Sequence, residues 1–295
     1  MPAARLLSGP MPILAAGILW GTTGTAASFA PAGADAAAVG SAALVLGGLL
    51  LFLTTRGSLR LAVGGTPARK VRLLLGAVTV AGYPVTFYPA VSMTGVAVAT
   101  VIALGSAPVF AGLLGWCLGH GRPSARWMWA TGAAVAGCGA LVLGPALDGS
   151  GARVDLVGVA LALVAGASYA AYSLIAGRLI SEGEASSPVM GVMFGGAALL
   201  VLPVVLATGP GWIATGAGLS ITVYLAFFTS FLAYRLFGIG LRNTSAETAT
   251  VLTLSEPAVA ALLGVVVLDE YLPPLSWAGL AVLALALAVL TTSDG

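Results

Sequence analysis

The sequence has very little charge. Lys and Arg together number 12, Asp and Glu number 10, and there is one His, so 7% of the 295 residues are charged while 59% are hydrophobic. A soluble globular chain carries about 25% charged residues, and this chain has too few to cover a protein of its size. The composition therefore excludes a soluble protein and predicts a membrane protein. A net charge of +2, with no basic run interleaved with aromatic residues, also argues against a nucleic-acid partner.

Residues for metal, disulfide and nucleotide chemistry are also scarce. The two cysteines, Cys117 and Cys138, lie inside apolar runs, which supports neither a disulfide framework nor a Cys-based metal site. A single His excludes the HExxH motif, and neither a GxxxxGK[ST] phosphate loop nor a GxSxG elbow is present. We therefore expect no enzyme, no ATP-driven pump, no metal and no cofactor.

What the chain has is a series of long uncharged intervals. About 20 apolar residues in a helix cross the hydrocarbon core of a bilayer. The first interval is longer than the apolar part of a secretory signal and is followed by nine similar ones, so we read it as a retained helix. The prediction is an all-α integral membrane protein with ten transmembrane helices, near residues 12–31, 36–55, two between 72 and 120 that separate at 92–95, 127–145, 155–177, 187–207, 218–241, 244–268 and 273–292.

The positions of Lys and Arg predict the orientation, because both residues favour cytoplasmic loops. With a cytoplasmic N-terminus, the outside segments hold only Arg153, and Arg235 is set aside because it falls within a predicted span. The inside segments hold Arg5, Arg56, Arg60, Arg69, Lys70, Arg72, Arg122, Arg126, Arg178 and Arg242. We expect a multi-pass protein of the cell (inner or plasma) membrane, in contact with lipids and with both termini cytoplasmic.

The chain also repeats itself. Within residues 94–104, Thr94, Ala99-Thr100-Val101 and Leu104 recur 150 residues later in 244–254. Within residues 106–115, Ser106, Pro108, Ala111 and Leu113-Leu114-Gly115 recur 149 residues later in 255–264. A fixed period of this kind indicates an internal repeat. Five spans per repeat place the two halves in opposite orientations, and inverted repeats are typical of carriers with a central site. The expected units are residues 1–150 and 151–295.

Several motifs resemble one known family. The stretch Leu254-Ser255-Glu256-Pro257-Ala258, the pair Asp269-Glu270 and Trp277-Ala278-Gly279 resemble the second EamA module of the drug/metabolite transporter superfamily. Residues 92–143, with Gly105-Ser106-Ala107-Pro108, resemble the first module, and Leu19-Trp20-Gly21 resembles the Trp-Gly pair of its first helix. The family's usual Gly-Glu after the ninth helix reads Asp269-Glu270 here. The resemblance implies ten helices, an inverted 5+5 arrangement and export of small metabolites such as amino acids.

Ionisable residues inside a membrane are costly and are candidates for function. Glu256 falls midway along the ninth span beside Pro257, which removes a helical hydrogen bond and predicts a kink. This carboxyl group is suited to bind an ammonium group or a proton; a structural role, as a neutral Glu bonded to an adjacent helix, is the alternative. Pro108, with Ser106, predicts a similar bend in the fourth span, and paired breaks point to the substrate cavity.

Aromatic residues fall in the middle of several spans rather than at the membrane interfaces. Tyr224, Phe228, Phe231 and Arg235 follow an α-helical spacing along the eighth span. Packing or lipid contact is the alternative for such a stripe, and Arg235 is either a carboxylate anchor or a side chain reaching the headgroups. The expected substrate site consists of Trp20, Thr23, Tyr83, Ser106, Tyr169, Tyr172, Tyr224, Phe228, Arg235 and Glu256, with helix breaks at Pro108 and Pro257.

These observations favour a secondary transporter that exports amino acids or related small metabolites by alternating access around a cavity between the repeats. Protons are a candidate coupling ion. A membrane scaffold or regulatory protein of the same fold and a channel-like facilitator are the alternative functions.

Overall fold

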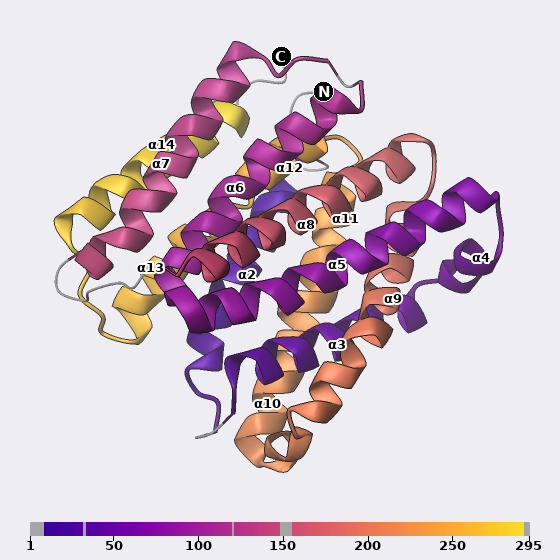
Figure 1. Cartoon of the computed structure of the whole chain (residues 1–295), viewed down its shortest axis with the longest axis horizontal. Helices are drawn as coiled ribbons and strands as arrows, with labels where there is room; N and C mark the ends of the chain where they lie inside the picture. The colour runs from indigo at the N-terminus through magenta and orange to yellow at the C-terminus, as the bar shows by residue number, and fades with distance from the viewer. Residues whose placement is uncertain (1–8, 32–33, 120, 148–154, 292–295) are drawn as a thin grey trace.

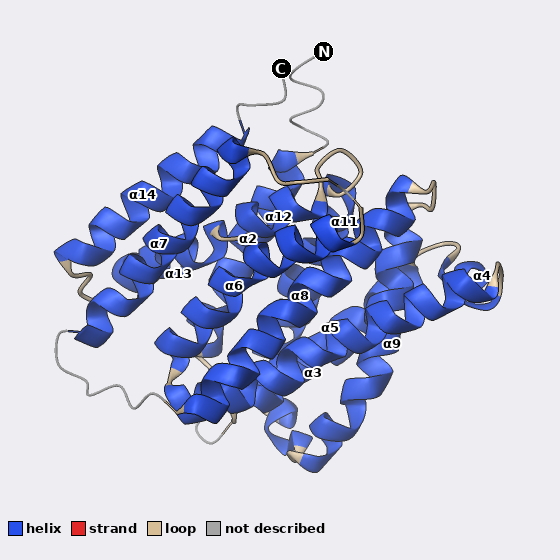
Figure 2. Cartoon of the chain, turned by 45° about the horizontal axis from the view of Figure 1, so that its top comes forward, coloured by secondary structure: helices blue, strands red, loops and turns tan. Residues whose placement is uncertain are grey.

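The structure is a computed structural model that describes residues 9–31, 34–119, 121–147 and 155–291. Within these ranges it is helical, with turns and loops and no strand (Figure 2). The boundary expected between residues 150 and 151 lies outside the described residues. The fold class predicted from the sequence is confirmed.

The expected spans correspond to helices at the expected places. The elements are α2 (Pro10–Ala27), α3 (Ala36–Thr54), α4 (Ser58–Val63), α5 (Pro67–Thr94), α6 (Val96–Cys117), α7 (Ala125–Leu147), α8 (Leu156–Ser181), α9 (Ser186–Ala207), η1 (Pro210–Ala214), α10 (Gly216–Tyr224), η2 (Leu225–Leu232), α11 (Ala233–Gly240), α12 (Ala246–Leu252), α13 (Ser255–Val267) and α14 (Pro274–Thr291). The short helix α4, in the loop before α5, was not predicted.

Nine helical segments among the described residues are long and apolar enough to cross a membrane. Two of them combine shorter elements, α10–η2–α11 over Gly216–Gly240 and α12–α13 over Ala246–Val267. The helix α2, at the place of the first expected span, is 18 residues long and is not one of these nine segments. The chain is a multi-pass membrane protein.

Glycines separate consecutive helices where the sequence predicted breaks. Gly95 stands between α5 and α6 with a φ of 83°, and Gly209 follows α9 with a φ of 75°. Glycine adopts such a left-handed backbone without the steric cost that a Cβ atom brings. Both expected breaks, at 92–95 and at 208–211, are confirmed.

The packing of the helices repeats between the two halves. In Figure 1, α5 and α8 run side by side through the middle of the bundle, and α7 and α14 pair at one edge. In the first repeat, α5 and α6 both pack on α8. In the second repeat, their counterparts pack on α2: η2 and α11 correspond to α5, and α13 corresponds to α6. The pairs α3 with α9 and α7 with α14 join equivalent helices. This exchange of equivalent partners is what two inverted five-helix repeats produce.

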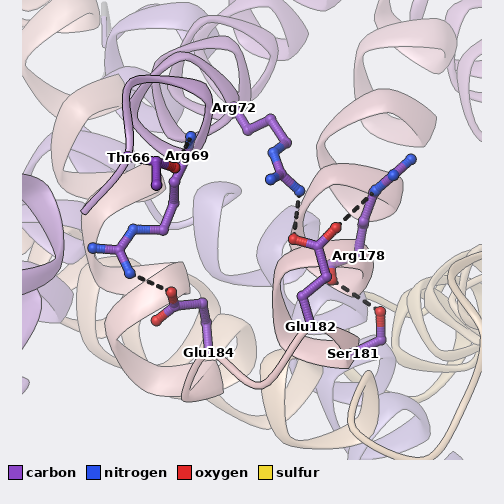
Figure 3. A network of polar contacts seen from close by, with 7 residues as sticks. All are labelled: Thr66, Arg69, Arg72, Arg178, Ser181, Glu182 and Glu184. Atoms are coloured by element: carbon purple, nitrogen blue, oxygen red, sulfur yellow. Dashed lines mark hydrogen bonds and ion pairs between the residues drawn. The ribbon is translucent and has the colours of Figure 1, made fainter.

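Arginines of α5 and α8 bind glutamates that follow α8 (Figure 3). Arg69 at the start of α5 forms an ion pair with Glu184 after α8, and Arg72 binds Glu182 at 2.5 Å. Arg178 also reaches Glu182, at 3.0 Å, and these hydrogen bonds, first from Arg178 and then from Arg72, lower the pKa of the Glu182 carboxyl group. The loop 56–72 and the loop after α8, both expected on the inside, therefore share one face. Arg5 and Arg153 lie outside the described residues.

Candidate functional site: a cavity between the repeats

A cavity of about 340 Å³ lies in the middle of the bundle. Its walls come from both halves of the chain: α2, α3, α5 and α6 from the first, and α8, η2, α11 and α13 from the second. The volume is at the small end of the range of about 300–1,000 Å³ for ligand sites. The cavity therefore has room for a small molecule.

Aromatic rings form a continuous chain along the cavity wall. Seven lining side chains follow one another with centroids 4.9 Å to 6.4 Å apart: Trp20, Tyr234, Tyr172, Tyr169, Tyr83, Phe87 and Tyr88. They belong to α2, α11, α8 and α5, so both repeats build the wall. These contacts lie within the range at which aromatic pairs attract each other, and the wall is expected to be stiff.

Two of these rings have their polar atoms bound to neighbouring helices. The indole Nε1 of Trp20 donates to the carbonyl oxygen of Thr229 at 2.8 Å. The hydroxyl of Tyr169 donates to Oγ1 of Thr253 at 2.6 Å. With its polar end engaged in the protein, each ring is held in a fixed orientation.

Glu256 lies on the cavity wall at the start of a half-helix. The ninth span is interrupted at Thr253 and Leu254, so α12 ends at Leu252 and α13 begins at Ser255. Glu256 is in the first turn of α13, where a carboxylate is favoured by the helix dipole. Pro257 follows in that same turn, where a missing N–H costs little. The break predicted from Pro257 is present.

Two glycines let α2 approach this half-helix closely. A Cβ atom on Gly21 would lie 2.8 Å from the carbonyl oxygen of Glu256 and 2.6 Å from Cβ of Val259. On Gly17 it would lie 2.1 Å from Oγ of Ser255. The start of α13 therefore packs closely on the backbone of α2 in the first repeat, most tightly at Gly21.

Among the described residues, the carboxylate of Glu256 stands without a partner. No hydrogen bond or ion pair joins it to another described residue. None of the described residues that line the cavity is Lys, Arg or His, and no group of three or more metal-binding side chains was found among the residues described. The site therefore presents a single acidic group within an aromatic wall.

The structure brings six of the expected site residues together on this wall. They are Trp20, Thr23, Tyr83, Tyr169, Tyr172 and Glu256. The other four are not among the cavity-lining residues. Their roles in substrate binding stay predictions without support from this cavity.

Tyr224, Phe228 and Arg235 lie along a span that is not a regular α-helix. Between Leu225 and Leu232 it is a π-helix, in which the wider turn rotates the residues that follow relative to α-helical spacing. Tyr224 donates to Thr22 at 2.9 Å, and Phe228 is 38% exposed. The exposed Arg235 lies over the ring of Phe231 at 5.9 Å. The expected stripe is therefore broken within the span.

Pro108 and Ser106 lie on α6, outside the residues that line the cavity. The helix α6 continues through Pro108 without interruption. Ser106 faces α8, where its Oγ would lie 2.2 Å from a Cβ atom on Gly166, and it donates to the carbonyl oxygen of Ala103 at 3.3 Å.

Sequence reasoning did not select two cavity tyrosines, Tyr88 and Tyr234. Tyr234 follows the π-helix, so its direction could not be derived from α-helical spacing. Tyr88 is adjacent to Phe87, and its hydroxyl would lie 1.4 Å from a Cβ atom on Gly40. A glycine opposite a tyrosine could predict this contact, but only if it is already known which two helices are neighbours.

Comparison with known proteins agrees with this architecture. Residues 7–143 and 156–292 each match the EamA-like transporter family. An uncharacterized transporter, YwfM of Bacillus subtilis (strain 168), is 39% identical over 281 residues, covering 95% of this chain and 93% of the relative.

Two further proteins are similar over much of the chain. The threonine/homoserine exporter RhtA of Escherichia coli (strain K12) is 29% identical over 211 residues, 70% of this chain and 66% of that protein. A solved crystal structure shares the fold with a TM-score of 0.77 at 18% identity, covering 95% of this chain and 94% of the other. From the family matches and the first of these relatives, the chain belongs to the EamA-like transporter family and is a transporter rather than an enzyme.

Proposed function

We propose that this protein is a secondary transporter that exports amino acids or related amine-bearing metabolites by alternating access around the central cavity. The observation that carries the proposal is the unpartnered Glu256 carboxylate on an aromatic wall that both repeats build. An inverted pair of repeats with a broken helix at the site is the arrangement of many secondary carriers. The name of one relative, a threonine/homoserine exporter, supports the amino-acid class.

The shape of the cavity supports one stage of such a cycle. Its lining residues extend from mid-bundle to Ala27 at the end of α2, Ala36 at the start of α3 and Val96 at the start of α6. These positions lie toward the face opposite the Arg69 and Arg72 ion pairs. In the other direction Tyr234 packs on the fully buried Phe194, at 3.9 Å between centroids. We propose that this conformation opens to the outside and is closed toward the cytoplasm.

The orientation and the plasma membrane as location are part of the proposal. An impermeant thiol reagent tests them in intact cells with Arg60→Cys and Thr208→Cys, two exposed positions at opposite faces, in a background with the exposed Cys117 replaced by Ser. Labelling of Thr208→Cys alone is expected. Labelling of Arg60→Cys alone would reverse the orientation.

A steric block tests transport through this cavity. Thr100→Trp places an indole on the cavity wall of α6, and Val109→Trp places the same group on the same helix, where Val109 is 47% exposed and outside the lining. In proteoliposomes, Thr100→Trp is expected to abolish uptake of labelled amino acids and amines, and Val109→Trp to retain it.

The same preparation separates the alternative functions. A carrier shows saturable uptake and counterflow, whereas a channel-like facilitator shows neither, and a scaffold shows no uptake in the wild type. Equal uptake by the two tryptophan variants would remove the cavity from the transport path.

A further inference from the structure

The charge of the cavity restricts what it can bind. Glu256 is the sole ionisable acid among the described lining residues, and no lining residue is basic. A buried charge is costly unless it is paired, and none of the residues that the structure describes supplies a partner for this carboxylate. A ligand that carries one positive charge would neutralise the site, and a ligand that carries a negative charge would add to the cost.

The aromatic wall favours the same ligand. A cation over the face of Trp or Tyr is attracted by the ring quadrupole, and cages of such rings bind ammonium groups. Here seven rings follow one another along the wall, and the polar ends of Trp20 and Tyr169 are bound to Thr229 and Thr253. Hydrogen bonding to these two groups is therefore satisfied within the protein, and their faces remain for the ligand.

An α-carboxylate, by contrast, finds no evident counter-group. Arg235, the expected anchor, is exposed, lies over Phe231 and is not a lining residue. The start of α13 offers little more, because the amide of Glu256 donates to the carbonyl oxygen of Thr253 at 3.0 Å and Pro257 has no amide hydrogen. A zwitterionic amino acid would bring one favourable and one unfavourable charge to the site.

We propose that the preferred substrate is an organic monocation, a protonated or quaternary amine with an apolar or aromatic body, and that the site discriminates against a carboxylate on the same molecule. Glu256 is the counter-ion, and the aromatic chain from Trp20 to Tyr88 surrounds the cationic group. This inference rests on the proposed function and narrows its substrate class from amino acids to amines.

The test compares matched ligands that differ in charge. Binding of phenethylamine, L-phenylalanine, 3-phenylpropionate and tetraethylammonium to the purified full-length protein in nanodiscs is measured by calorimetry. Phenethylamine is expected to bind at least about tenfold more tightly than L-phenylalanine, since an uncompensated charge in an apolar site costs more than one tenfold step in affinity. The carboxylate ligand is expected to show no binding.

Variants identify the group responsible. Glu256→Gln is expected to weaken phenethylamine binding by at least about tenfold and to remove the preference over L-phenylalanine, and Glu256→Asp, which keeps the charge, to retain the preference. Glu247→Gln, which removes a carboxyl group of the same span outside the cavity lining, is the matched control and is expected to bind as the wild type does.

The outcomes separate this inference from the proposed function. Equal or tighter binding of L-phenylalanine by the wild type overturns the inference without any variant. Counterflow of amino acids without binding of either amine also overturns the inference, but it leaves the proposed transport function standing. Absence of binding and of counterflow for every ligand overturns both.

Discussion

The two equivalent spans α6 and α12–α13 share a Ser-x-Pro and a Leu-Leu-Gly motif but differ in structure. The first is one continuous helix, and the second is interrupted at Thr253 and Leu254. In the first repeat Ser106 faces Gly166 of α8, and in the second Ser255 faces Gly17 of α2, with each pair 149 residues from its counterpart. Each serine hydroxyl would lie about as close to a Cβ atom on its glycine, at 2.2 Å and 2.1 Å. The internal symmetry therefore extends to single side-chain contacts.

The next residue breaks the symmetry. After Ser106 comes Ala107, which is fully buried inside an unbroken helix, and after Ser255 comes Glu256, which lies on the cavity wall beside a helix break. The repeated serine and glycine set the packing of the two halves, whereas Glu256, whose counterpart is Ala107, supplies the charge of the site. The following predictions test that division, in order of expected effect.

The largest effect is expected when the acid is moved to the equivalent place in α6. Ala107→Glu puts a carboxylate where the alanine has no exposed surface and no cavity to face, and is expected to destabilise the protein by at least about 3 kcal/mol. The midpoint of thermal unfolding in detergent measures the loss. Ala107→Gln has nearly the same volume and separates charge from overpacking, and equal stability of Ala107→Glu and the wild type would contradict the structural difference between the spans.

A moderate loss of stability is expected when the glycines that face Ser106 and Ser255 are replaced, and its size should differ between the two repeats. A Cβ atom on Gly166 would lie 2.6 Å from the backbone oxygen of Ala103, whereas on Gly17 it would meet chiefly the hydroxyl of Ser255, which can rotate away. Gly166→Ala is therefore expected to cost about 1–3 kcal/mol and Gly17→Ala less. Gly24→Ala, with no atom within 4 Å, is the control, and a larger loss in Gly17→Ala than in Gly166→Ala would show that the contacts differ from this description.

The smallest effect is expected at the ion pairs that join the repeats. Glu182 has a lowered pKa, so its contribution to stability is present above the ordinary carboxyl pKa of about 4.3 and is lost as pH falls through the lower value in the folded protein. Because the side chain is 41% exposed, solvent screens it and the loss is small. Glu182→Gln should flatten the acid side of a plot of melting temperature against pH, and an unchanged plot would deny the pair a role in stability.

The transmembrane spans could be predicted because the cost of burying charge dictates where they lie. The gaps between charges located α3, α5 and α9 closely, and Pro257 located the break before α13. The π-helix at Leu225–Leu232 could not be predicted, because no Pro or Gly marks it.

The cavity was predictable in part for the same reason. Trp20 and Tyr169, 149 residues apart, both line it, as mid-span aromatic residues were expected to do. Tyr234 and Arg235 could not be placed, since their directions depend on the preceding irregular turn. Ser106 was expected in the cavity as the polar neighbour of Pro108, but it packs on Gly166, as Ser255 packs on the equivalent Gly17.

The central claim is that Glu256, the residue that breaks the symmetry, binds the transported molecule. Counterflow of labelled phenethylamine in proteoliposomes, compared between the wild type and Glu256→Gln at matched reconstitution and equal melting temperature, tests it most directly. Counterflow is expected in the wild type and is expected to be lost in Glu256→Gln. Undiminished counterflow in that variant, with loss of only pH-driven accumulation, would assign Glu256 to proton coupling and contradict the claim.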